Sequence, residues 1–148
     1  AGISVSGIIP SSVNEAVQLL EKIPVVIMGG TIPGHTTDAV AIRFAIAANA
    51  KKCIIATNVE KVYDDDPRLN PNAESHEYLT HHELQKIVGP AEHEKAGKSS
   101  VVDPIGVAEA LNARMELNIL DGRVSQRIRE AMEGDYFLGT VVSSEGKI

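Results

Sequence analysis

The chain has 148 residues, of which 43% are hydrophobic, a length and balance typical of one ordinary α/β domain. Its 20 acidic residues outnumber 14 basic ones, giving a formal charge of −6 without a basic stripe, which argues against a nucleic-acid partner. The chain has one cysteine, Cys53, so a disulfide framework is ruled out and a reducing, cytoplasmic compartment is favoured. No run of residues is apolar enough for a membrane helix or patterned as a signal peptide, so we expect a soluble protein.

A helix and a strand are predicted near the start of the chain. Residues 11–23 (SSVNEAVQLLEKI) place apolar residues at helical spacing, with Ser12 as N-cap and Glu15 at the capping-box position. Residues 24–30 (PVVIMGG) form a β-branched run without a polar face, which is typical of a strand buried on both sides in a parallel sheet.

The next predicted helix, residues 38–50 (DAVAIRFAIAANA), is apolar around most of its circumference. After Asp38 its only charged residue is Arg43. Such a helix needs a second surface over it besides the sheet, from another segment or another subunit, and we favour another subunit.

The remainder of the chain alternates strands with helices. Strands are expected at residues 51–58, 116–121 and 136–144, and helices at residues 79–87, 102–115 and 123–133. Two of these helices have clear start signals: Thr80 with Glu83, and Asp103 followed by Pro104. The alternation predicts a single α/β domain over residues 1–148 with a mostly parallel sheet and helices on both faces.

The loop at residues 29–38 (GGTIPGHTTD) connects the strand at 24–30 to the helix at 38–50. Its glycines allow close backbone approach to a ligand, and its threonines add hydroxyl donors beside a helix N-terminus, so a phosphate is the favoured ligand. The alternative is that the glycines only turn the chain and that Thr37 or Asp38 only caps the helix.

A second, longer loop covers residues 57–80 (TNVEKVYDDDPRLNPNAESHEYLT). Its length favours a binding element or a lid, although a solvated surface excursion is an alternative. Tyr63 is suited to flank a flat base, and the three aspartates that follow it more often solvate a loop than bind a divalent ion. His81 and His82 lack the spacing of zinc ligands, and no metal site is predicted. No P-loop, G-x-G-x-x-G turn or G-x-S-x-G elbow occurs in the sequence.

Five segments together resemble a known family. They are VVIMGGTIPGHTTDAVA, ATNVEKVYDDDPRLNP, LTHHEL, AGKSSVVDP and GTVV. In this order they resemble the UMP kinases of archaeal type, within the amino acid kinase family. The resemblance implies a three-layer αβα sandwich, transfer of the γ-phosphoryl group of ATP to UMP in pyrimidine nucleotide synthesis, and a hexamer built from dimers.

The resemblance also assigns site residues. The residues that fall on the UMP-binding loop are Thr31, Ile32, Pro33, Gly34, His35, Thr36 and Thr37. Those that fall on ATP-binding positions are Thr57, Asn58, Tyr63 and Asp66. Asp38 and Asp103 fall on acidic positions near the reacting phosphates, where an electrostatic or Mg²⁺-organising role is expected. Lys98 is either a cation near the helix that begins at Asp103 or a surface lysine.

Two departures from the family pattern leave alternatives open. Glu60 and Lys61 stand where the family has Asp-Gly, so a glycine that permits a tight turn is absent and the ATP loop is expected to sit differently. The family's N-terminal strand, glycine-rich loop and following helix have no counterpart, so this chain alone should be an incomplete kinase. The alternatives are a non-catalytic nucleotide-binding or storage relative, and a family member with another acceptor, such as an amino acid carboxylate or a carbamate.

Overall fold

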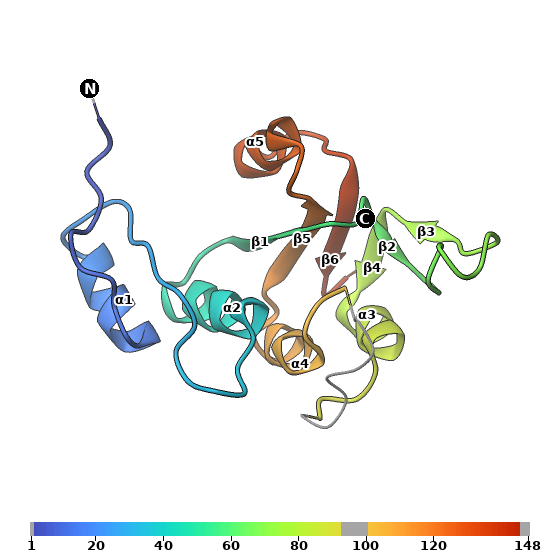
Figure 1. Ribbon diagram of the computed structural model, residues 1–148, viewed down its shortest axis with the longest axis horizontal. Coiled ribbons are helices and arrows are strands. Elements are labelled where there is room, and N and C mark those ends of the chain that lie inside the picture. The colour runs from blue at the N-terminus through green and yellow to red at the C-terminus, as the bar shows by residue number, and fades with distance from the viewer. Residues whose placement is uncertain (1, 93–100, 146–148) are drawn as a thin grey trace.

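A four-stranded sheet lies at the centre of the computed structural model, which describes residues 2–92 and 101–145 (Figure 1). The strands lie in the order β1 (Lys52–Thr57), β5 (Glu116–Asp121), β6 (Gly139–Ser143) and β4 (Tyr78–Thr80). The pairs β1–β5 and β4–β6 are parallel, and β5–β6 is antiparallel. This arrangement confirms the predicted α/β class and the mostly parallel sheet.

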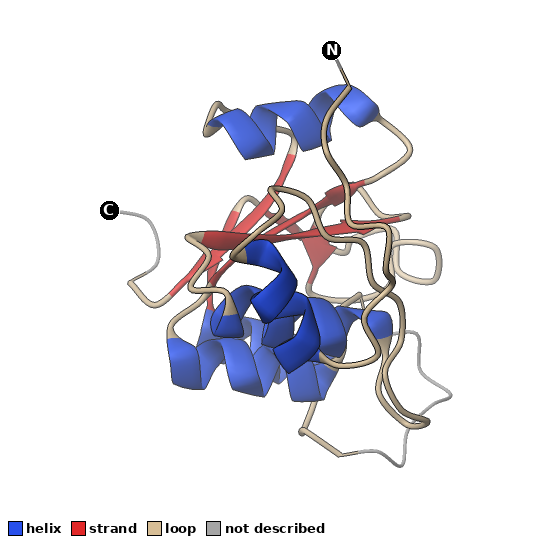
Figure 2. Cartoon of the chain, turned by 90° about the vertical axis from the view of Figure 1, so that its left-hand side faces the viewer, coloured by secondary structure: helices blue, strands red, loops and turns tan. Residues whose placement is uncertain are grey.

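Helices cover both faces of this sheet. On one face lie α2 (Thr37–Ala47), α3 (His81–Val88) and α4 (Pro104–Ala113), and α5 (Ser125–Glu133) lies on the other. Figure 2 shows the strands between these two helical layers. The three-layer αβα sandwich is therefore confirmed. No helix within residues 2–92 and 101–145 is both long enough and apolar enough to cross a membrane.

The central strand β5 shows why a sandwich forms. Leu117 and Ile119 are fully buried against the three-helix layer, and Leu120, on the opposite face, is fully buried against α5. A strand with apolar side chains on both faces is stable only when both faces are covered. Cys53, in the neighbouring strand, is also part of this core.

The helix starts follow the predicted caps closely. In α1 (Val13–Leu20), the Ser12 hydroxyl accepts a hydrogen bond from the Glu15 backbone at 3.2 Å. At α3, Thr80 and Glu83 form a complete capping box. These signals are readable from sequence because a cap and its partner lie within one helical turn of each other.

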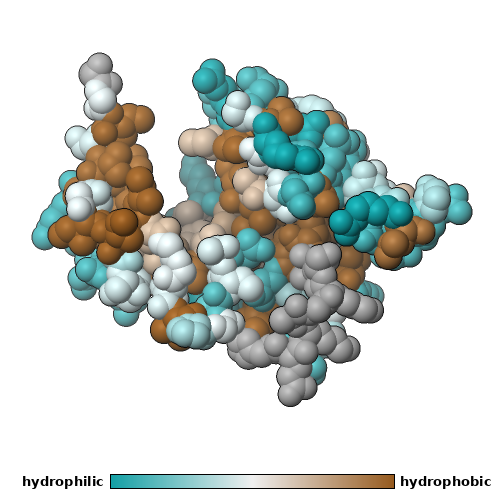
Figure 3. Space-filling view, viewed as in Figure 1, coloured by the Kyte–Doolittle hydropathy of each residue, from teal (hydrophilic) through white to brown (hydrophobic). Residues whose placement is uncertain are grey.

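The strand predicted at residues 24–30 is absent. Only Val25 forms a bridge, with Val5, and Ile27 is 58% exposed. A β-branched run becomes a strand only where another strand supplies ladder hydrogen bonds, and the rest of the described chain supplies a single bridging residue here. Figure 3 shows apolar side chains gathered on the N-terminal part of the chain, where Ile8 and Ile9 are also exposed.

Two further expectations are refined by the structure. The second cover of α2 includes α4 and α1 of the same chain. Val40 and Ile42 are buried, while Phe44 and Ile46 stay partly exposed, so a further cover by another subunit stays a prediction. Within the loop at 57–80, β2 (Val62–Tyr63) and β3 (Ser75–His76) form a short antiparallel hairpin. The buried Thr140 hydroxyl holds this hairpin by accepting from the Val62 backbone at 2.9 Å and donating to the His76 carbonyl at 2.5 Å.

Candidate active site at the joined helix starts

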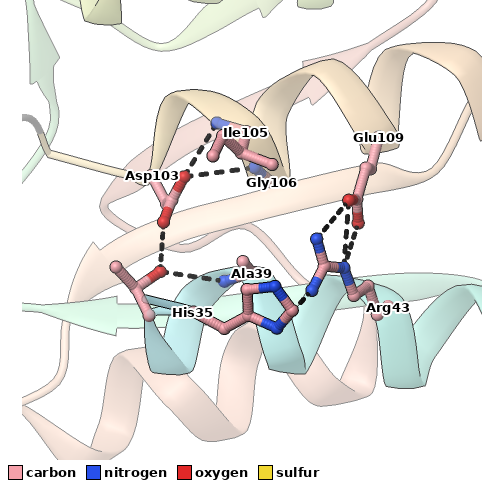
Figure 4. Close-up of polar contacts among 8 residues, drawn as sticks. His35, Ala39, Arg43, Asp103, Ile105, Gly106 and Glu109 are labelled. Carbon is pink, nitrogen blue, oxygen red and sulfur yellow. Dashed lines mark hydrogen bonds and ion pairs between the residues drawn. The ribbon is translucent and has the colours of Figure 1, made fainter. Parts of the chain in front are cut away.

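The N-termini of α2 and α4 are joined by their own capping residues. The Thr36 hydroxyl donates a hydrogen bond to the Asp103 carboxylate, and its oxygen accepts from the Ala39 backbone at 3.2 Å. The other Asp103 oxygen accepts from the Ile105 backbone at 2.7 Å (Figure 4). Each residue therefore caps its own helix and also binds the other cap, so the two helix starts are held side by side.

A glycine allows the two helices to approach each other. A Cβ at Gly106 would lie 2.9 Å from Cδ1 of Ile42 and 3.2 Å from Cα of Ala39, both closer than ordinary van der Waals contact. A Cβ at this position would require the Ile42 side chain to move and the Ala39 backbone to give way by a few tenths of an ångström. The bond between Thr36 and Asp103 therefore depends on a helix surface without a side chain at Gly106.

Two carboxylates share this corner of the fold. Burial raises the pKa of Asp38 above its ordinary value, the Asp103 charge raises it further, and a hydrogen bond from the Asp103 backbone opposes these effects. The start of a helix carries a partial positive charge, and here two helix starts meet. Such a corner is suited to anions, with the paired carboxylates available to a divalent cation that accompanies them.

The residues predicted to bind UMP lie on one loop that leads into α2. Gly34 has a φ of +91°, a backbone conformation that favours glycine, and a backbone bond from His35 to the Ile32 carbonyl closes a turn around it. Thr31 and His35 are half-buried, and the exposed members are Ile32, Pro33, Gly34, Thr36 and Thr37. The fold thus brings the predicted UMP loop together with both predicted catalytic acids, Asp38 and Asp103.

A charged cluster that the sequence analysis did not identify supports this loop. Arg43 makes a forked ion pair with Glu109 of α4, at 2.6 Å between Nη2 and Oε1, and its Nη1 lies 2.8 Å from Nδ1 of His35. The only signal in the sequence was an isolated arginine in an apolar helix. Its partner lies 66 residues away, so no local pattern could identify it.

Polar residues also gather where β1 and β5 end. Thr57 lies opposite Asp121, and the Arg123 guanidinium bonds both the Asp121 carboxylate and the Asn58 carbonyl. The Arg123 side chain lowers the pKa of Asp121 to about 2. Thr57 and Asn58 were predicted from the sequence but Asp121 and Arg123 were not, although parallel strands place their carboxyl ends together.

The other two predicted ATP residues, Tyr63 and Asp66, lie further along the same loop and interact within it. Tyr63 pairs with Ser75 in the β2–β3 hairpin. Asp66 forms an ion pair with Arg68 at 2.8 Å, and that arginine lowers the pKa of Asp66 to about 2. The structure therefore places Thr57 and Asn58 at the sheet edge and Tyr63 and Asp66 in the hairpin region.

The run of aspartates organises the loop. Asp64 accepts from the Glu74 backbone, and Asp65 accepts from the Asp66 backbone, each at 2.8 Å. Among the described residues, no group of three or more His, Cys, Asp or Glu side chains is placed to hold a metal ion. Lys98 lies outside the described residues.

Glu60 and Lys61, which stand where the family has Asp-Gly, lie in a turn with ordinary backbone angles. In the described part of the chain, the non-glycine residues with positive φ are Asn49 and Arg114, so the turn at 60–61 does not require a glycine. Instead, Glu60 pairs with Arg127 of α5 at 3.2 Å and Lys61 pairs with Glu77 at 2.9 Å.

Comparisons with known proteins identify the family of this chain. A sequence profile described as the amino acid kinase family matches residues 2–121. The chain is 42% identical over 122 residues to a uridylate kinase of Pyrococcus abyssi, which covers 82% of this chain and 52% of that protein. A uridylate kinase of Methanococcoides burtonii is 41% identical over 123 residues, covering 83% of this chain and 52% of that protein. The chain thus spans about half the length of these curated relatives.

Solved structures show the same relationship. The crystal structure of uridylate kinase from Archaeoglobus fulgidus matches with a TM-score of 0.81 at 32% identity, covering 95% of this chain and 62% of that one. Aspartokinase III of E. coli matches with a TM-score of 0.58 at 21% identity, covering 88% of this chain and 28% of that one. At that identity the second match indicates a common fold only.

Proposed function

The chain belongs to the amino acid kinase family, and on this premise we propose that the protein of which it is part transfers the γ-phosphoryl group of ATP to UMP, giving UDP for pyrimidine nucleotide synthesis. One observation carries the proposal: the loop at residues 31–37 ends where Thr36 and Asp103 join two helix starts, in a chain 42% identical to a uridylate kinase. A cytoplasmic hexamer is part of the same proposal, and the mass of the assembly in solution tests it.

The acceptor phosphate is best accommodated at the start of α2. The first backbone N–H groups of a helix have no partner within the helix, and the helix dipole adds roughly half a positive charge. Exposed Thr37 offers a hydroxyl group at the same place, and Gly34 lets the loop backbone approach a ligand closely. These groups together favour a monophosphate over a neutral acceptor.

The donor nucleotide is best accommodated at the carboxyl ends of β1 and β5, where open α/β sheets usually bind ligands. Thr57 and Asn58 provide polar groups there, while Tyr63 and Asp66 extend the site into the hairpin region. The Tyr63 ring is suited to pack on adenine. Arg123, whose Nη2 donates a hydrogen bond to the Asn58 carbonyl at 3.1 Å, adds a cation close to the donor nucleotide.

Phosphoryl transfer requires mainly that two polyanions be held in line while their charge is offset. Mg²⁺ fits the corner formed by Asp38 and Asp103, because it usually takes one or two carboxylates together with substrate phosphates. When bound, it would offset charge on the transferred group. The chain's own residues hold the acceptor at the helix start and keep the two carboxylates beside it, and no protein nucleophile is required.

The test uses the full-length protein with UMP, ATP and Mg²⁺, and phosphorus NMR follows the products. Formation of UDP in step with ADP is expected. Consumption of ATP only when an amino acid or carbamate replaces UMP would contradict the proposal. So would calorimetric binding of ATP without any transfer, the behaviour of a storage relative.

A further inference from the structure

We propose that Arg43 is a positioning residue for UMP: held by Glu109, it fixes His35 and thereby the acceptor loop, which we define as residues 31–37. This inference rests on the proposed function above. It assigns a role to the one charge that an otherwise apolar helix carries after Asp38.

The geometry fixes the direction of the guanidinium. Nε of Arg43 lies 3.0 Å from Oε1 and 2.8 Å from Oε2 of Glu109, and Nη2 lies 2.6 Å from Oε1 (Figure 4). Because the guanidinium is planar and rigid, this fork sets the plane of the whole group. Its remaining nitrogen, Nη1, is then aimed at His35, 2.8 Å away.

This contact also fixes the tautomer of His35. A guanidinium can only donate hydrogen bonds, so Nδ1 of His35 must present its lone pair to Arg43. The proton of the neutral ring is therefore on Nε2. Arg43 thus sets both the position of the ring and the nitrogen that carries its proton.

The acceptor loop has two such anchors next to each other. Thr36 bonds to Asp103 at the start of α4, and His35 bonds to Arg43, which is itself bonded to Glu109 further along α4. Gly34, with positive φ, precedes both anchors, so the exposed part of the loop turns directly before them. Loss of the Arg43 anchor is expected to free the side of the loop that faces the acceptor.

A purely structural role for Arg43 would be to hold α2 against α4. That packing already has its own basis, because Ala39 and Ile42 lie against Gly106 in the close contact described above. The ion pair is half-buried, with 28% and 31% of the two side chains exposed, so its forked geometry adds to this packing and is not its sole basis. The positioning role predicts a selective effect on UMP, whereas the structural role predicts a general loss.

The experiment measures kcat and both KM values for the full-length protein and its variants. Arg43→Gln is expected to raise KM for UMP about tenfold, the effect of losing one charge-assisted hydrogen bond, with KM for ATP within about twofold of wild type. Arg43→Lys, which keeps the charge but not the fork, should have a KM for UMP between those of wild type and Arg43→Gln. The matched control is Arg129→Gln, an exposed arginine on α5, which should change neither constant.

A double variant tests whether Arg43 acts through His35. If it does, the combination of His35→Ala with Arg43→Gln should have the same KM for UMP as His35→Ala alone. Two independent, additive effects would overturn the proposal, as would equal increases in the KM values for UMP and ATP.

A spectroscopic measurement keeps this proposal separate from the kinase assignment. Nitrogen NMR of the histidine-labelled protein should show His35 of the wild type with an unprotonated Nδ1, and Arg43→Gln should lose that fixed tautomer. A wild-type protein that makes no UDP would refute the kinase assignment, while this spectrum would still report on Arg43. A protonated Nδ1 in an active wild type would refute the positioning role alone.

Discussion

Replacing Gly106 by alanine tests whether the close approach of α2 and α4 builds the acceptor site. The new Cβ would lie 2.9 Å from Cδ1 of Ile42 and 3.2 Å from Cα of Ala39, so at least one helix must move by a few tenths of an ångström. Such overpacking costs about 1–3 kcal/mol, and the better helix propensity of alanine returns about 1 kcal/mol. The net expectation is a loss of about 1 kcal/mol of unfolding free energy. The same movement should lengthen the bond between Thr36 and Asp103 and raise KM for UMP.

Urea denaturation and steady-state kinetics of the full-length protein measure the two effects together. Ile42→Val removes the Cδ1 atom that meets the new methyl group, and on its own costs about 0.5–1.5 kcal/mol. The double variant should therefore lose less stability than the sum of the two single variants and recover part of the UMP affinity. Strict additivity, with KM for UMP unchanged in Gly106→Ala, would show that the approach of α2 and α4 does not shape the acceptor site.

Three further predictions concern Asp38, Cys53 and Thr140. Because the pKa of Asp38 is raised above 3.8 in the folded state, the charge of this carboxylate opposes folding at neutral pH. Asp38→Asn should therefore be inactive but have a higher melting temperature than wild type at pH 7, and this gain should vanish below pH 3.8. A difference in melting temperature that does not depend on pH would contradict this. Burial raises the pKa of Cys53 to about 11, so Ellman's reagent should react with this thiol only after unfolding, and equal rates in the native and unfolded protein would contradict its placement. Thr140→Val leaves the Val62 N–H and the His76 carbonyl without their partner and should lower the unfolding free energy by about 2 kcal/mol. Thr140→Ser keeps the hydroxyl and should be close to wild type. Equal urea midpoints for the two variants would count against this role of the hydroxyl.

Features of the fold that depend on neighbours in sequence were predictable. Ser12, Thr80 and Asp103 were identified as helix caps because each binds a backbone group within three residues. The strand β5 was predicted with its observed bounds, Glu116–Asp121, because its apolar run is closed by polar residues. Where the signal and the partner lie close together, the sequence was sufficient.

Features that depend on distant partners were not predictable from the pattern. The run at residues 24–30 has the composition of a strand, but a strand also needs a neighbour, and only Val5 provides one. The bond from Thr36 to Asp103 joins residues 67 apart, and the pair of Arg43 with Glu109 joins residues 66 apart. The loops proposed to form the site could thus be located in the sequence, whereas the contacts that hold them could be known only from the fold.

The central claim is that the acceptor monophosphate lies where the acceptor loop meets the joined starts of α2 and α4. A crystal structure of the full-length protein with UMP tests it most directly. We expect the phosphate within hydrogen-bonding distance of the Thr36 or Thr37 backbone, beside the Asp103 carboxylate. Ordered UMP at another position, with residues 31–37 free of ligand, would contradict it.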